Sequence, residues 1–303
     1  MMAASNSMNF NGVLLLNEAM EKHTSWRSGG AVDQFYTPVD LHDLSLFIRS
    51  LPADEQIMFI GLGSNLLVRD DGYRGTVISL KGSLSDIELL EGTKLRVGAG
   101  VSCAKLARFC SRNNLIGGEF FAGIPGLVGG ALAMNAGAFG GETWPVVSSV
   151  ITVNKQGDIH NRKADDYEVS YRTVKGHEDE WFVSVDFEFE SGDGEAAAER
   201  VKALLKKRSE TQPTGLPSCG SVFKNPEGDH AARLIEVSGL KGFAIGDAVV
   251  SEKHANFIIN KGKAKPSEIE AVIKKVQQVV KEKQGVELVT EVRIVGELSS
   301  ESL

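Results

Sequence analysis

The chain has 303 residues, of which 42% are apolar and 24% are charged, so it can bury a sizeable core and global disorder is excluded. This length favours two or three compact units over one ordinary domain. Lys and Arg total 33 against 40 Asp and Glu, which gives a net charge of -7. Because proteins that coat nucleic acid or an anionic membrane need a basic surface, this balance argues against both partners.

The cysteines indicate a reducing compartment. Cys103, Cys110 and Cys219 are widely spaced and form no C-x-x-C pair, so we expect neither a disulfide framework nor a metal site. The apolar run at residues 13–16 is shorter than the roughly 7–15 residues of a secretory signal. We therefore expect a cytoplasmic protein.

In the front part, apolar spacing predicts a helix over residues 40–50, and Ser102 is the predicted N-cap of a second helix that runs through Cys110. Short apolar runs predict a turn into a strand within residues 24–37, and strands over residues 57–60, 66–68, 76–80 and 94–97.

Further along, strands are predicted over residues 147–153, 167–171, 181–189 and 286–295. A connecting helix is predicted over residues 195–208, and a second helix over 267–284 begins after Pro266 and ends at Gly285. Strands and helices alternate irregularly, so the predicted fold class is α+β. A large glycine-looped portion stands in front, and a smaller unit behind resembles an open-faced sandwich.

Glycine is the informative excess: 33 of 303 residues, against a usual share of about 7%. The first cluster, Gly61-Leu62-Gly63-Ser64-Asn65, follows a predicted strand. It is not a Rossmann fingerprint, because Leu66 occupies the third glycine position and another strand-like run follows. Small residues and two side-chain donors suit a diphosphate, although a tight β-turn also explains two glycines.

The second cluster places nine glycines within residues 117–141. Residues 122–141 carry no charge, but the glycines and Pro125 disfavour a transmembrane helix. Glycine at this density costs conformational entropy, so it calls for a compensating gain. A flat dinucleotide lying on bare backbone is the natural candidate.

Seven motifs occur in the order typical of one family. They are Gly61-Leu62-Gly63-Ser64-Asn65-Leu66, Gly123-Ile124-Pro125-Gly126 with Gly129-Gly130-Ala131, Met134-Asn135-Ala136-Gly137-Ala138, Ser170-Tyr171-Arg172, the run at residues 217–226, the run at residues 253–260, and Glu291-Val292-Arg293. With them the chain resembles the UDP-N-acetylenolpyruvoylglucosamine reductase (MurB) family, in its shorter subtype.

This resemblance implies a PCMH-type flavin fold made of two FAD-binding subdomains, residues 1–80 and 81–195, followed by an α+β substrate-binding domain, residues 196–303. It implies non-covalent FAD, because Ala31 stands where related flavin oxidases can carry an anchoring histidine. The implied FAD-binding residues are Gly61, Gly63, Ser64, Asn65, Leu66, Gly123, Ile124, Pro125, Gly126, Gly129 and Gly130, with Asn135 and Ala136 near the isoalloxazine ring.

The implied reaction has two halves: NADPH reduces FAD, and the flavin N5 then passes hydride to the enolpyruvyl group of a nucleotide sugar. Arg172 matches the group that stabilises the substrate carboxylate, Ser221 the proton donor, and Glu291 the residue that assists protonation. From the residues alone, a surface arginine, a turn serine and an exposed carboxylate remain the alternatives. Cys219 is a less favoured donor.

Tyr171, Lys224, Asn225 and His254 match positions that bind substrate, and a core or capping histidine is the alternative for His254. Two other functions remain open: an FAD-dependent oxidase of the broader PCMH-type class, and an inactive binder of nucleotide sugars. We expect a monomer acting on a small molecule, without metal, nucleic-acid or membrane partners.

Overall fold

The computed structural model describes residues 10–297, and the chain divides into two compact units. The first unit comprises Met1–Leu16, Gln34–Gly61 and Gly75–Val201, and the second comprises Asn17–Asp33, Leu62–Arg74 and Lys202–Leu303. Each unit therefore assembles segments that are far apart in the sequence. The predicted division at residues 80 and 195 is a finer one and stays a prediction.

One four-stranded sheet has the order β1-β2-β5-β3. Its strands are β1 (Val13–Ala19), β2 (Ala31–Thr37), β5 (Tyr73–Ser79) and β3 (Ile57–Ile60). Strand β4 (Leu66–Val68) lies between β3 and β5 in the sequence and is not part of this sheet. Helix α1 (Leu41–Ser50) begins where the Asp40 carboxylate accepts a hydrogen bond from the Asp43 amide, and it buries Leu44, Phe47 and Ile48. The apolar spacing predicted this helix.

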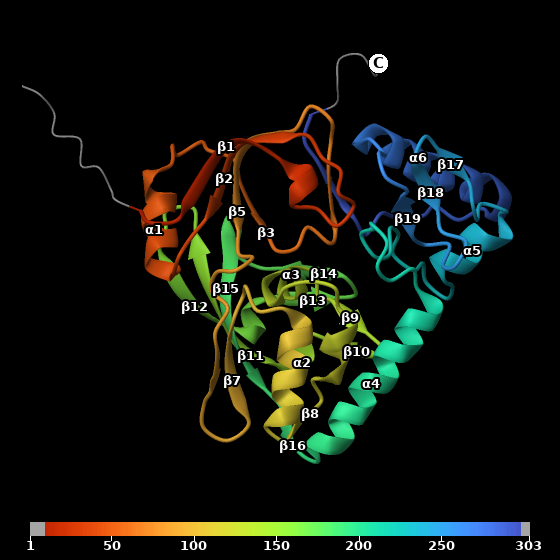
Figure 1. The fold of residues 1–303 in the computed structure, drawn as a ribbon. Helices are drawn as coiled ribbons and strands as arrows, with labels where there is room; N and C mark the ends of the chain where they lie inside the picture. The colour runs from red at the N-terminus through yellow and green to blue at the C-terminus, as the bar shows by residue number, and fades with distance from the viewer. Residues whose placement is uncertain (1–9, 298–303) are drawn as a thin grey trace, which may run out of the picture. The chain divides into compact units, whose positions relative to one another are not determined.

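The first unit also contains a five-stranded antiparallel sheet of order β12-β11-β15-β7-β6 (Figure 1). Its strands are β6 (Ile87–Leu89), β7 (Lys94–Gly98), β11 (Val147–Asn154), β12 (Ile159–Lys163) and β15 (Glu180–Glu188). Val183, Val185 and Phe187 alternate toward the core, which also receives the apolar side of α2 (Cys103–Arg112). As predicted, the Ser102 hydroxyl caps α2 by accepting from the Lys105 amide.

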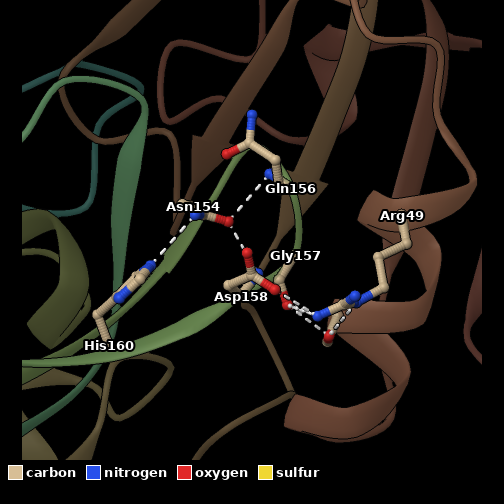
Figure 2. Close-up of polar contacts among 7 residues, drawn as sticks. Arg49, Asn154, Gln156, Gly157, Asp158 and His160 are labelled. Atoms are coloured by element: carbon tan, nitrogen blue, oxygen red, sulfur yellow. Dashed lines mark hydrogen bonds and ion pairs between the residues drawn. The ribbon is translucent and has the colours of Figure 1, made fainter.

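Helix α1 is fastened to the turn between β11 and β12, as Figure 2 shows. The Ser45 hydroxyl donates to the Gly157 carbonyl at 2.6 Å, and Arg49 Nη2 lies 2.6 Å from Asp158 Oδ1. Gly157 has a φ of +76°, and a Cβ there would stand 2.6 Å from the Ser45 carbonyl oxygen. Only glycine allows this close approach between helix and turn.

The glycine-rich stretch folds into short elements. They are β8 (Leu115–Ile116), η2 (Glu119–Gly123), α3 (Val128–Ala133), β9 (Gly137–Ala138), β10 (Gly141–Glu142) and η3 (Trp144–Val146). Within the described residues, no helix combines the length and apolarity that a membrane crossing requires. The hairpin that follows consists of β13 (Glu168–Ser170) and β14 (Thr173–Lys175), after η4 (Ala164–Asp166).

The connecting helix α4 (Gly194–Thr211) follows β16 (Glu190–Ser191), and the rest of the chain belongs to the second unit. Its elements are η1 (Met20–Lys22), α5 (Ala231–Val237), β17 (Ala244–Ile245), β18 (Ala248–Val250), β19 (Ile258–Asn260), α6 (Pro266–Gln284) and β20 (Arg293–Val295). Strands β17, β18 and β19 form a sheet on which α6 packs with Ile269, Val272 and Ile273. Gly285 ends α6 in the left-handed conformation, as its place in the sequence predicted.

The predicted closing strand over residues 286–295 is wrong over most of its length. Only Arg293–Val295 forms a strand, which pairs in parallel with β4. The preceding segment runs along residues 222–224 instead, where Thr290 forms an isolated bridge with Phe223. Leu288 and Val292 are buried by this irregular packing, whereas Val289 is exposed, and an apolar pattern alone does not distinguish such a segment from a strand.

An ion pair in the second unit yields a prediction for stability. Arg69 Nε lies 2.9 Å from Glu270 Oε2 on α6, where the carboxyl is buried. The hydrogen bond from Arg69 holds the pKa of Glu270 below its usual range. We expect Glu270→Gln to lower the free energy of unfolding at pH 7 by about 1–3 kcal/mol, as measured by urea denaturation.

The sign of the pH dependence follows from the depressed pKa. The stabilisation is complete above the unfolded pKa of about 4.3 and is lost as pH falls through the lower folded value. The difference between wild type and E270Q should therefore shrink in acid. The matched control is Glu287→Gln, because Glu287 makes an exposed pair with Lys281. An equal loss of stability in both variants would contradict the prediction.

Candidate active site

Arg172 occupies the two-residue loop of the β13–β14 hairpin in a strained conformation, with a φ of +53°. Its Nη1 donates to the Asn135 carbonyl at 3.2 Å and its Nη2 donates to the Gly137 carbonyl at 2.9 Å. The guanidinium carbon also lies 5.1 Å from the centroid of the Tyr171 ring. These contacts hold the Arg172 side chain in one direction, whereas the side chain of an ordinary surface arginine is free to move. A strained backbone of this kind is common at functional sites.

Asn135, whose carbonyl holds Arg172, is itself tightly constrained. It is 1% exposed and has a φ of +44°. Its Oδ1 accepts from the Trp144 amide at 3.1 Å, and its Nδ2 donates to Glu142 Oε2 at 2.9 Å. Both ends of the side-chain amide are therefore used inside the protein, and the residue orients Arg172 through its backbone. Asn135 and the buried Ala136 were both expected to lie near the isoalloxazine ring, and this expectation stays a prediction.

In the second unit, the segments of Ser221 and Glu291 lie side by side. The amide of Glu291 donates to the Val222 carbonyl at 2.8 Å, and the amide of Val292 donates to the same oxygen at 3.3 Å. The Ser221 and Glu291 residues are both half-buried. The structure thus brings together the backbone segments that carry two of the three predicted catalytic residues within this unit, while Arg172 belongs to the first unit.

The first glycine loop meets the same region of the second unit. Asn65 Nδ2 donates to the Glu291 carbonyl at 3.1 Å, and the Cys219 thiol lies 3.4 Å from the Gly63 carbonyl oxygen. Burial raises the pKa of Cys219 to about 12, so the thiol stays protonated. This loop therefore contacts the segments that carry Ser221 and Glu291. The role at FAD that the sequence predicted for the loop did not indicate these contacts.

The same loop fits a phosphate-bearing cofactor in its backbone. The Ser25 amide donates to the Gly63 carbonyl at 3.0 Å, and the Ser25 hydroxyl donates to the Leu62 carbonyl at 3.4 Å. Because C=O and N–H point in opposite directions across a trans peptide, the amides of Gly63 and Ser64 point away from Ser25. Two successive amides aimed the same way suit an anionic oxygen.

The predicted FAD-binding glycines divide into two kinds. A Cβ on Gly61 would lie 3.0 Å from Leu127 Cγ, and one on Gly129 would lie 3.0 Å from Ala99 Cβ, so packing explains both. Gly130 is exposed on α3, and a Cβ there would meet no described atom within 4 Å beyond its chain neighbours and the nearby backbone of its own helix. Glycine at this position therefore leaves room for a ligand. The other predicted residues here precede α3: Gly123, Ile124, Pro125 and Gly126.

Packing also accounts for part of the glycine excess that suggested a flat ligand. A Cβ on Gly123 would stand 2.5 Å from the Phe139 ring, one on Gly137 would stand 2.4 Å from the Gly141 carbonyl oxygen, and one on Gly141 would stand 2.6 Å from the Phe120 ring. These three glycines serve the fold of the stretch itself, and the sequence did not separate them from Gly130.

The predicted substrate residues have different surroundings. Asn225 is exposed, and its Oδ1 accepts from the Ala231 amide at the start of α5, while Lys224 is half-buried. Tyr171 is 44% exposed in the hairpin loop. The Nδ1 of His254 is buried without a hydrogen-bond partner among the described residues, and burial lowers the pKa of this histidine. It stays neutral at pH 7.

Comparison with known proteins identifies the family. Residues 212–295 match the model of the UDP-N-acetylenolpyruvoylglucosamine reductase C-terminal domain, and residues 32–162 match an FAD binding domain. A UDP-N-acetylenolpyruvoylglucosamine reductase from Alkalilimnicola ehrlichii is 56% identical over 93% of this chain and 95% of its own length. The chain belongs to the UDP-N-acetylenolpyruvoylglucosamine reductase (MurB) family. A relative from Legionella pneumophila (strain Corby) is 52% identical over 98% of this chain and 96% of its own length.

A crystal structure of MurB from Thermus caldophilus superposes with a TM-score of 0.80 at 28% identity, over 94% of this chain and 99% of that one. Membership of the MurB family confirms the predicted fold class, a PCMH-type FAD-binding portion with an α+β C-terminal domain. It also confirms that the chain is an enzyme, a flavin-dependent oxidoreductase. FAD is accordingly its cofactor.

Sequence reasoning did not single out Glu142, which binds the side chain of Asn135. Glu142 stands at the end of the glycine-rich stretch, seven residues beyond its partner. No local pattern marks such a pair, because the two residues meet only through the folding of β9 and β10.

Proposed function

We propose that the chain reduces UDP-N-acetylglucosamine enolpyruvate to UDP-N-acetylmuramate with NADPH as reductant, as a step of peptidoglycan precursor synthesis and hence of cell shape and division. The observation that carries the proposal is the side-by-side packing of the Ser221 and Glu291 segments in a MurB-family domain. We further propose a cytoplasmic monomer, a location with which three buried, unpaired thiols agree.

Arg172 binds the substrate carboxylate in this proposal. When bound, FAD would take electrons from NADPH and supply the hydride that reaches the terminal carbon of the enolpyruvyl group. Negative charge then develops on the adjacent carbon and spreads into the carboxylate, where a planar guanidinium offers two parallel donors. Because the carbonyls of Asn135 and Gly137 already fix this guanidinium, little reorganisation is needed as the charge develops.

Ser221 donates the proton that completes the reduction, from its Oγ to the adjacent carbon. A serine hydroxyl is a weak acid, so the alkoxide that it leaves needs stabilisation by neighbouring charge, which Lys224 supplies in this proposal. Glu291 assists protonation of the enol-like species. Substrate contacts are assigned to Tyr171, Lys224, Asn225 and His254, of which Lys224 and Asn225 follow Ser221 on the same segment.

Gly130 offers a test of the FAD site that does not depend on turnover. We expect Gly130→Ala to raise the melting temperature of the apoprotein slightly, because alanine is better than glycine in a helix by about 0.5–1 kcal/mol. The same methyl group should weaken FAD binding, measured by quenching of flavin fluorescence. Ala133→Ser, on an exposed position of the same helix, is the control. Unchanged FAD affinity in G130A would remove Gly130 from the cofactor site.

The visible spectrum of the purified protein tests the function as a whole. NADPH should bleach the yellow flavin absorbance under anaerobic conditions, and UDP-N-acetylglucosamine enolpyruvate should then restore it. Restoration by oxygen alone, with consumption of sugar alcohols and no response to the enolpyruvyl substrate, would replace this proposal by the oxidase alternative. Substrate affinity without any flavin absorbance would indicate an inactive binder.

A further inference from the structure

Asn256, to which neither the sequence motifs nor the proposed mechanism assigns a role, holds the backbone directly after Ser221. It is 3% exposed. Its Oδ1 accepts from the Phe223 amide at 3.0 Å, and its Nδ2 donates to the Phe223 carbonyl at 2.8 Å. Its own carbonyl accepts from the Val222 amide at 2.9 Å. One residue thus makes three hydrogen bonds to two consecutive residues.

The opposite side of this backbone is bound by the segment of Glu291. The Val222 carbonyl accepts from the Glu291 amide at 2.8 Å, and the Lys224 amide donates to the Val289 carbonyl at 2.9 Å. Two successive peptide groups, those that follow Val222 and Phe223, therefore each have one end on Asn256 and the other on residues 289–291. The side-chain amide of Asn256 therefore pairs with the backbone of Phe223 in the way that a neighbouring β-strand would.

We propose that Asn256 is a positioning residue that sets Ser221 relative to Glu291 for the proton-delivery step. This inference rests on the proposed function, which gives those two residues their roles. Misplacement of a reacting group by 1 Å can cost about 10²-fold in rate. An asparagine amide offers one donor and one acceptor at a fixed separation, which is the pattern that the peptide edge of Phe223 requires.

Asn260 provides a matched control four residues further along the chain. It is 2% exposed, its Nδ2 donates to the Trp26 carbonyl at 2.8 Å, and its Oδ1 accepts from the amides of Gly262 and Ala264. These partners do not include Ser221 or Glu291. Replacement of Asn260 by alanine removes three side-chain hydrogen bonds, against two for Asn256. It therefore reports the effect of lost stability alone on the reaction rates.

The experiment compares Asn256→Ala with Asn260→Ala in the FAD-loaded protein by stopped-flow absorbance. Both variants should lose thermal stability and keep normal reduction of FAD by NADPH. Only N256A should slow reoxidation by the enolpyruvyl substrate, by about 10²-fold. Amide hydrogen exchange at Val222, Phe223 and Glu291 should also become faster in N256A alone.

Equal reoxidation rates in N256A and N260A would overturn the inference while leaving the proposed function intact. If wild-type protein itself fails to be reoxidised by the substrate, the proposed function fails instead. Should N256A not fold, Asn256→Ser retains a hydroxyl one bond closer to the backbone than the amide of Asn256 and should show a smaller slowing of reoxidation. A wild-type rate in N256S would overturn the inference as well.

Discussion

Ser221→Ala is expected to leave the reduction of FAD by NADPH unchanged and to slow reoxidation by the enolpyruvyl substrate by about 10²–10⁴-fold. That range is typical for the loss of one general acid. The physical reason is that hydride addition leaves a carbanion-like centre, which reverts unless a proton reaches it. Stopped-flow absorbance of the two half-reactions, measured separately, checks this expectation.

Two controls separate the hydroxyl of Ser221 from the loop that carries it. Ser218→Ala removes a hydroxyl three residues earlier, whose bond to the Leu216 carbonyl is a long 3.4 Å. Cys219→Ala removes the other candidate donor, which is buried and directed at backbone carbonyls of residues 63 and 66. Both variants should keep a normal second half-reaction. A normal second half-reaction in FAD-loaded S221A would exclude the serine as donor.

Arg172→Lys should lower the rate of the second half-reaction by about 10²–10³-fold and weaken substrate binding, although the charge is kept. Lysine is a point charge and cannot offer the two parallel donors of a guanidinium to a carboxylate. Its three donors also cannot hold the carbonyls of Asn135 and Gly137, as Arg172 does, and at the same time present two donors to a carboxylate. The expected loss is similar to that on removal of one oxyanion-stabilising donor.

The comparison for R172K is Arg96→Lys, because Arg96 makes a two-pronged ion pair with Asp186 in the same unit. R96K likewise replaces a guanidinium that makes two parallel hydrogen bonds, but at an exposed position. The rates of both half-reactions should therefore stay close to those of the wild type. If R172K and R96K behave alike, Arg172 is a structural residue of the hairpin and the carboxylate must be bound elsewhere.

Local patterns gave the helices reliably. Helix α1 forms over the predicted range, α2 begins at the predicted cap Ser102, and α6 ends at the predicted Gly285. A cap and an apolar stripe are properties of a few neighbouring residues, so they are readable without knowledge of the rest of the chain. Residues 286–292 were assigned wrongly for the opposite reason, since the backbone partners of Val289, Glu291 and Val292 lie at Lys224 and Val222, far away in the sequence.

The candidate site shows the same division. The motifs supplied Arg172, Ser221 and Glu291 as residue types with suitable chemistry. They did not reveal that two backbone carbonyls orient Arg172, or that Asn256 and the Glu291 segment grip the backbone after Ser221 from both sides. Those contacts join segments between about 30 and 70 residues apart, and no spacing in the sequence encodes them.

By itself, the sequence determined the MurB family, the helices with their caps, and the residues able to carry the chemistry, because each depends on side-chain identity at short spacing. The tertiary structure alone decided which glycines face open space and which let the chain pack on itself. Gly130 and Gly137 are both glycines of the same stretch, but a Cβ on Gly130 would face open space and a Cβ on Gly137 would meet a backbone oxygen. That difference lies in the neighbours that folding brings near each Cα, and these come from elsewhere in the chain.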